Sequence, residues 1–200
     1  MEIFLKDQAV VISRRFIGNS DVALSIYTKN MGVENIIIQN GQLIRNLPYI
    51  YLDKFTYFDG VFIKLRNDKI YITDIDRVYT LGISISKDYD NFTYSSKMID
   101  FIYKYSPYPD TNIYNLLKKS LYHISRSKNG YKIFISFLVK FNYLLGIYDP
   151  KKISLDREGL QILSIIFKTK IQDAENLKLD RYFYQKLYDK LIENLNRWLS

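Results

Sequence analysis

Cations and an aromatic residue flank one turn near the start of the chain. The turn has the sequence Gly-Asn-Ser-Asp at residues 18–21; Arg14 and Arg15 precede it, and Tyr27 and Lys29 follow it. Guanidinium and ammonium groups contact phosphate oxygens, and a flat aromatic ring stacks on a nucleic-acid base. This combination is typical of a surface that binds a polyanion, although ordinary exposed hairpins contain the same residue types.

The segments on either side of this turn, residues 10–16 and 22–28, have the β-branched and aromatic composition of strands. Similar segments follow at residues 33–39, 49–58, 61–66 and 70–75, and Asn, Gly and Asp residues that favour turns separate several of them. This succession of short strands within residues 1–80 predicts a small antiparallel β-barrel of the OB type.

After residue 90 the apolar residues recur at the spacing of helices. Helices are predicted over residues 94–105, 111–128, 133–145, 160–168 and 177–199, with Thr111 as the N-cap of the second. Phe134, Phe137 and Phe141 lie on the apolar face of the third and are expected in the core. The predicted fold is therefore α+β, with an OB-fold β-barrel at residues 1–80 followed by a helical bundle at residues 81–200.

Alternation of side chains along strands assigns faces to the predicted barrel. The residues expected inside are Val10 and Ile12 on the first strand, Val22, Leu24 and Ile26 on the second, and Ile36 and Ile38 on the third. Arg14 continues the inward row at the rim of the barrel. The outward residues that suit a nucleic-acid strand are Arg15, Tyr27, Lys29, Lys64 and Arg66.

Positive charge is concentrated in the helical half of the chain. Lys and Arg outnumber Asp and Glu by 29 to 21, for a net charge of +8, and residues 81–200 carry +7 of it. Such an excess favours an acidic partner, such as a nucleic acid, an acidic peptide or a membrane surface. The basic residues around the second interhelical turn are Lys118, Lys119, Arg126, Lys128 and Lys132.

The motifs of several enzyme classes are missing from the sequence. The chain has no cysteine and one histidine, His123, and it contains no Walker A, dinucleotide-binding or G-x-S-x-G motif. Thiolate zinc sites and disulfides are thereby excluded, and we expect no catalytic residue, metal or cofactor. Asp74 and Asp76 could together hold magnesium, but their spacing is common in exposed turns. Without a signal peptide or a membrane-spanning stretch, a cytoplasmic protein is expected.

The order of these features resembles the RecO family of bacterial recombination mediators. The resemblance rests on residues 8–28, QAVVISRRFIGNSDVALSIYT, followed by Gly32, Gly41, the helical run 134–146 and Pro150. It implies an OB-fold joined to a helical domain that binds single- and double-stranded DNA and anneals complementary strands. It further implies action at the nucleoid with RecR and single-strand binding protein to load RecA, without covalent chemistry.

The sequence departs from the family in two places. Family members often carry a four-cysteine zinc site in the helical domain, whereas this chain continues from Pro150 to Lys151 and Lys152 without a cysteine. The family also tends to have a basic cluster after the third strand, and here only Arg45 supplies charge in that position.

Two functions therefore remain open. The first is a recombination mediator that binds DNA mainly through phosphate contacts. The second is an adaptor that bridges RecR and single-strand binding protein and has little DNA binding of its own, as the nearly neutral first half of the chain indicates. In both, the resemblance makes the basic cluster of the helical half the candidate site for the acidic C-terminal tail of single-strand binding protein.

Overall fold

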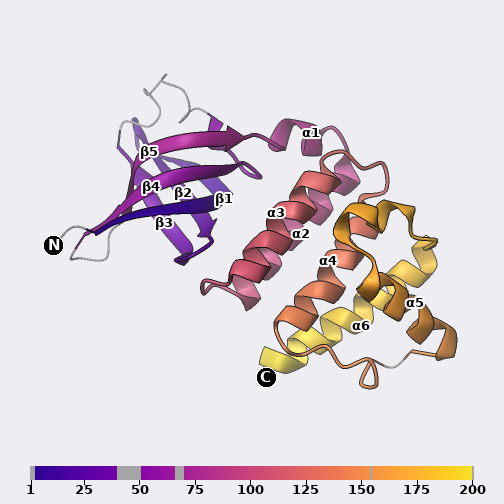
Figure 1. Ribbon diagram of the computed structural model, residues 1–200. Helices are drawn as coiled ribbons and strands as arrows, with labels where there is room; N and C mark the ends of the chain where they lie inside the picture. Colours follow the sequence, from indigo (N-terminus) through magenta and orange to yellow (C-terminus); the bar gives the residue numbers. More distant parts are fainter. Residues whose placement is uncertain (1–2, 40–50, 66–69, 154, 200) are drawn as a thin grey trace. The chain divides into compact units, whose positions relative to one another are not determined.

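The protein has an α+β fold, as the sequence predicts, with a five-stranded antiparallel sheet followed by helices (Figure 1). The computed structural model describes residues 3–39, 51–65, 70–153 and 155–199. The strands are β1 (Ile3–Ile17), β2 (Asp21–Thr28), β3 (Gly32–Ile38), β4 (Tyr57–Lys64) and β5 (Ile70–Tyr79). The helices are α1 (Gly82–Ser86), α2 (Tyr89–Tyr105), α3 (Thr111–Ile124), α4 (Gly130–Leu144), α5 (Arg157–Lys168), the 3-10 helix η2 (Ile171–Asn176) and α6 (Arg181–Leu199).

The chain divides into two compact units. Unit 1 contains Met1–Ser84 and Ile99–Tyr114, and unit 2 contains Ile85–Met98 and Asn115–Ser200. The last turns of α2, the connection to α3 and the first turn of α3 therefore belong to the same unit as the sheet. The sequence predicts a boundary near residue 80, but it gives no sign that residues 99–114 belong with the sheet.

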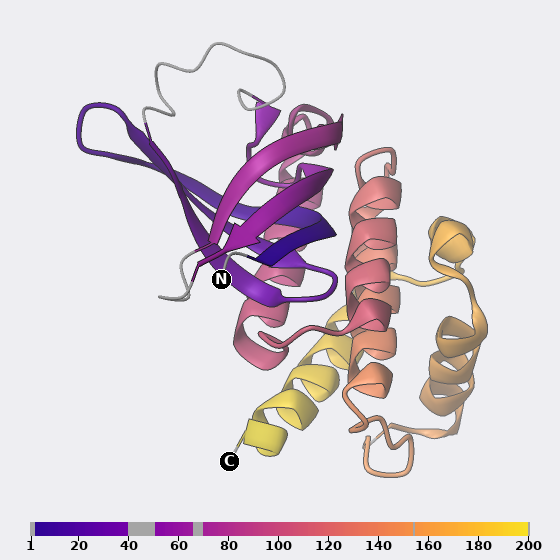
Figure 2. The ribbon, with the colours of Figure 1, turned by 60° about the vertical axis from the view of Figure 1, so that its left-hand side comes forward.

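The sheet of unit 1 has the strand order β3-β2-β1-β4-β5, and every hydrogen-bonded pair is antiparallel. It is an open sheet that curls strongly, as Figure 2 shows, and residues of its edge strands β3 and β5 approach each other. β1 is the longest strand and lies at the centre, where it pairs with β4 through residues 3–10 and with β2 through residues 9–17.

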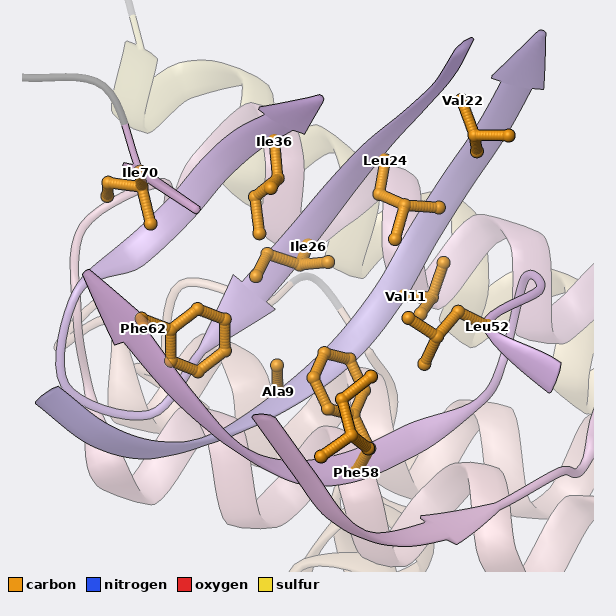
Figure 3. Packing of buried hydrophobic residues seen from close by; sticks show 11 residues of the cluster. Ala9, Val11, Val22, Leu24, Ile26, Ile36, Leu52, Phe58, Phe62 and Ile70 are labelled. Carbon is orange, nitrogen blue, oxygen red and sulfur yellow. The ribbon is translucent and has the colours of Figure 1, made fainter. Parts of the chain in front are cut away.

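A cluster of buried aliphatic and aromatic side chains fills the concave side of the sheet (Figure 3). Its members are Ala9, Val11, Val22, Leu24, Ile26, Ile36, Leu52, Phe58, Phe62, Ile70 and Ile75. The inward positions predicted on the second and third strands are confirmed. Val22, Leu24, Ile26 and Ile36 belong to the cluster, and Ile38 packs against it. Each Val, Leu, Ile or Phe side chain of the cluster contributes about 1.5–3 kcal/mol when it leaves water.

The inward positions predicted on the first strand are wrong. Val11, not Val10, pairs with the core residue Ile26, and Val10 pairs with Tyr27 on the opposite face, where both are buried. A register shift between Val11 and Ser13 then resets the alternation. A sequence pattern with period two has no means of showing this shift.

Unit 2 is built around α4, which contacts α5, α6 and η2. Phe134, Phe137 and Phe141 are fully buried, as predicted. Leu187 and Leu191 of α6, one helical turn apart, are also fully buried.

The helix boundaries differ from the predicted ones because aspartates cap two helices. Asp88 Oδ1 accepts a hydrogen bond from the Asn91 N–H at 2.8 Å, so α2 begins before the predicted residue 94. Asp110 Oδ1 accepts from the Ile113 N–H at 3.0 Å, and Asp110, rather than Thr111, is the N-cap of α3.

Gly32 allows the connection between α2 and α3 to lie against the start of β3. The Val33 N–H donates to the Pro107 carbonyl oxygen at 2.8 Å, and Gly32 has a φ of +84°. A Cβ at this position would lie 2.5 Å from the same carbonyl oxygen. Only glycine meets both the conformational and the steric requirement.

We predict that Gly32→Ala lowers the free energy of unfolding by about 3 kcal/mol, since it adds a backbone clash to the cost of a left-handed conformation. Gly18→Ala is the matched control, because Gly18 has a φ of +54° but open space around a Cβ. It should cost about 1 kcal/mol. Urea unfolding of both variants measures the difference, and equal losses would contradict the importance of the Pro107 contact.

Candidate nucleic-acid interface

The hairpin that joins β1 to β2 presents an aromatic ring and two arginines beside its turn. Phe16 is 67% exposed and Arg15 is exposed, while Arg14 is half-buried with its guanidinium carbon 5.7 Å from the centre of the Phe16 ring. Gly18, with its positive φ, and Ser20, whose hydroxyl donates to Asp21 at 3.0 Å, form the turn. The hairpin therefore combines the stacking and phosphate-binding groups that a nucleic-acid strand requires.

Strand pairing explains why this hairpin is exposed. The ladder between β1 and β4 ends at Val10, whereas β1 continues to pair with β2 as far as Ile17. In the described part of the sheet, the last residues of β1 thus pair on one side only. Figure 2 shows the hairpin extending beyond the rest of the sheet.

The register places the three side chains on two faces of the hairpin. Arg14 lies opposite Leu24 and Phe16 opposite Val22, both on the side of the core, while Arg15 lies opposite Ala23 on the other side. Arg14 and Phe16 therefore share one face at the hairpin end, and Arg15 lies on the other face.

The outer face beside Arg15 consists mainly of small residues. Ser25 donates a hydrogen bond from its hydroxyl to Asn35 at 2.7 Å across β2 and β3, and Ala23 lies between Arg15 and the exposed Ile37. Small side chains leave room for a polymer backbone to lie close to the sheet.

Tyr27 was expected to stack on a base, and the structure shows that this expectation is wrong. Its side chain is completely buried, its hydroxyl donates to the Tyr108 carbonyl oxygen at 3.4 Å, and its ring centre lies 6.2 Å from that of Tyr114. Burial raises the pKa of Tyr27. The residue does point away from the concave core, but residues 99–114 of the same unit cover it.

Lys29 and Lys64 do not join Arg15 on a common surface. Lys29 follows the end of β2, where its N–H donates to the Gln8 carbonyl oxygen at 2.9 Å, so Lys29 lies about six strand residues, or roughly 20 Å, from the level of Arg15. Lys64 lies opposite the core residue Ile70, on the inner row and not on the predicted outer face. Arg45 and Arg66 lie outside the described residues.

Sequence reasoning missed Phe16 as a candidate stacking residue. It assigned the stacking role to Tyr27, and it treated Phe16 only as the end of a strand. The signal that could have identified Phe16 is its position, directly after the arginine pair and two residues before the glycine of the turn.

Other cations of the sheet are engaged in ion pairs. Lys6 Nζ lies 2.9 Å from Asp76 Oδ2, and Arg77 Nε lies 3.0 Å from Asp59 Oδ2. The ion pair with Lys6 also occupies one of the two acids considered for magnesium. Within the described ranges, no three or more His, Cys, Asp or Glu side chains form a group that could hold a metal ion.

Two members of the basic cluster of the helical half gather around Glu175 of η2. Glu175 Oε1 accepts hydrogen bonds from the Ser127 hydroxyl and the Lys128 N–H, each at 2.9 Å, and its carbonyl oxygen accepts from Lys132 Nζ at 3.1 Å. Part of the positive charge at this turn therefore stabilises the fold of unit 2.

The remaining members lie on α3 and just after it. Lys119 and Arg126 are exposed, Lys118 is half-buried, and the Arg126 guanidinium carbon lies 4.2 Å from the centre of the Tyr122 ring. His123 contacts the same ring edge to face at 5.2 Å. Burial lowers the pKa of His123, and the charges of Arg126 and Lys119 lower this pKa further.

Comparison with known proteins adds no assignment. No protein-family model matches the sequence, and no curated protein is significantly similar to it. Among the helices that the structure describes, none combines the length and apolar character needed to cross a membrane.

His123 gives a direct measurement of the charge around the predicted partner site. Because it is the only histidine, its proton NMR titration is unambiguous, and we predict a midpoint below the ordinary value of 6.5. Arg126→Ala should raise the pKa, since it removes a positive charge, and Asp173→Asn should lower it. Because the folded state favours neutral His123, the free energy of unfolding includes a favourable contribution from this residue above pH 6.5. This contribution is lost as the pH falls through the pKa of His123 in the folded protein. A midpoint above 6.5 would contradict this description.

Proposed function

We propose that this chain is a non-catalytic protein that binds single-stranded nucleic acid at the end of its β1–β2 hairpin. The observation that carries the proposal is the exposed Phe16 ring beside Arg14 and Arg15. A base stacks on the ring while the two guanidinium groups contact neighbouring phosphates. No covalent step is required of any of these residues.

The arrangement of the sheet supports the same proposal. We propose that the five strands form an OB-type barrel, since β1 pairs with both β2 and β4 and the edge strands β3 and β5 approach each other. OB-folds bind oligonucleotides through the face of strands 2 and 3 and through the loop between strands 1 and 2. Phe16 and Arg15 lie beside that loop.

The wider role rests on the resemblance to the RecO family. In this proposal the chain binds single- and double-stranded DNA in the cytoplasm at the nucleoid, anneals complementary strands, and acts with RecR to load RecA. The acidic tail of single-strand binding protein is received by the basic cluster of unit 2. Exposed Lys119, Arg126 and Lys128 supply the charge for that contact.

The second candidate function, an adaptor between RecR and single-strand binding protein, is favoured by a different observation. Tyr27 is buried, and Lys6 and Arg77 of the sheet are held in ion pairs. A sheet with few available cations would bind DNA weakly, and the protein contacts would then carry the function.

A titration of fluorescent oligothymidylate across a salt series separates the two functions. The binding constant should fall as salt rises, with a slope of about −0.7 for each phosphate contacted in a single strand. We predict that Arg15→Ala makes this slope less steep by about 0.7, because one phosphate contact is lost. Lys87→Ala is the control: it removes the same charge from an exposed residue outside the hairpin and should leave the slope unchanged. Absence of salt-sensitive binding by the unmodified protein would favour the adaptor.

Phe16→Ala tests stacking separately from charge. We predict a loss of about 1–3 kcal/mol in binding free energy with an unchanged salt slope, because the substitution removes a stacking surface but no charge. Phe16→Tyr should retain binding. Phe4→Ala is the matched control, since Phe4 is 64% exposed near the other end of β1. Equal effects of the two alanine variants would place the binding site away from the hairpin.

A further inference from the structure

A cluster of three aromatic rings in unit 2 is only partly covered. The cluster consists of Tyr143 in the last turn of α4, Tyr148 in the connection after α4, and Phe167 in α5. Tyr148 and Phe167 stack with ring centres 5.0 Å apart and an interplanar angle of 10°. Tyr143 meets Phe167 edge to face at 5.1 Å and is itself 56% exposed.

Neighbouring groups hold this aromatic cluster in place. Lys140 Nζ donates to the Phe167 carbonyl oxygen at 2.6 Å and lies 5.7 Å from the centre of the Phe167 ring. Burial lowers the pKa of Lys140, and it raises the pKa of Tyr148. Tyr143 therefore projects from a fixed support, and little side-chain entropy remains to be lost when a ligand covers it.

Exposed lysines flank the cluster along the chain. Lys168 follows Phe167 directly, and Lys151 lies three residues after Tyr148. Two acids of the same region form ion pairs. Asp149 Oδ2 lies 3.9 Å from Lys152 Nζ, and Asp156 Oδ2 lies 3.0 Å from Lys186 Nζ. Lys151 and Lys168 are therefore exposed lysines close in sequence to the aromatic cluster, and the two acids are paired with other lysines.

From this arrangement we infer that the aromatic cluster of Tyr143, Tyr148 and Phe167 is a second contact site for single-stranded nucleic acid, with one base stacked on Tyr143. This inference rests on the proposed function of the chain, and it adds a site on the helical unit. A projecting flat ring suits a base, which needs a face to stack on, whereas an apolar side chain of an acidic peptide needs a recess. The flanking lysines match the phosphates on either side of that base.

The first test uses the full chain and an oligothymidylate that carries iodouracil, which forms a covalent bond to a stacked aromatic side chain under ultraviolet light. Mass spectrometry of the digested protein should identify crosslinks at Tyr143 as well as at Phe16. Crosslinks at Phe16 without any at Tyr143 would overturn the second site and leave the proposed function intact. An unmodified protein that does not bind the oligonucleotide would contradict the proposed function itself.

The second test compares affinities of variants. Tyr143→Ala should weaken oligothymidylate binding about 5- to 150-fold, the effect of removing one stacked base, and Tyr143→Phe should retain it. Tyr182→Ala is the control, since Tyr182 is an 83% exposed tyrosine on α6 of the same unit. Tyr143→Phe keeps the ring and Tyr182 is 83% exposed, so both of these variants should unfold at the same urea concentration as the unmodified protein, whereas Tyr143→Ala also loses the edge-to-face contact with Phe167 and should unfold at a slightly lower one. Unchanged oligonucleotide affinity of Tyr143→Ala, together with weaker binding of a polyglutamate probe, would overturn the inference in favour of an acidic protein partner.

Discussion

The pairing of β1 with two different strands is the constraint on which the sheet and its candidate site depend. Residues 3–10 of β1 pair with β4, and residues 9–17 pair with β2, so the two ladders overlap only at Ala9 and Val10. At the exchange, Val11 donates to the Thr56 carbonyl oxygen and accepts from the Phe55 N–H. After this point β1 has left β4, and its last residues form a ribbon with β2 and β3.

This exchange explains why the candidate binding groups lie at the hairpin end. A two-stranded hairpin is only marginally stable in water, but here β3 adds a third strand up to Ile38, which pairs with Val22. The core residues Val22 and Leu24 secure the side of the ribbon that carries Phe16 and Arg14. Phe16 can therefore remain exposed without loss of the strand pairing that positions it.

Local sequence patterns predicted those parts of the fold that depend on local physics. The alternation of Val22, Leu24 and Ile26 survives because their strand is regular, and the spacing of Phe134, Phe137 and Phe141 survives because α4 is an uninterrupted helix.

The parts that the sequence did not reveal depend on irregularity or on distant segments. Val10 was misplaced because the register shift near Ile12 changes parity, and nothing in the residue types at 10–13 requires that shift. Tyr27 was misplaced for another reason. Its direction follows from the strand, but its burial comes from Tyr114 and the backbone of Tyr108, more than eighty residues away. Neither period two nor period 3.6 carries that information.

The charges of unit 2 show why a net charge alone does not locate a binding surface. The ammonium group of Lys132 donates to the Glu175 carbonyl oxygen and that of Lys140 to the Phe167 carbonyl oxygen in α5, so these two cations stabilise the fold. The cations that remain exposed are spread over several elements, and each alone would contribute little to the binding free energy of an acidic partner. Contacts of this kind become effective when they act on one strand together, because the second contact is then intramolecular and its effective concentration reaches the millimolar range. Within each unit, a cation near a stacking ring therefore adds more to binding when both groups contact the same strand than either adds alone.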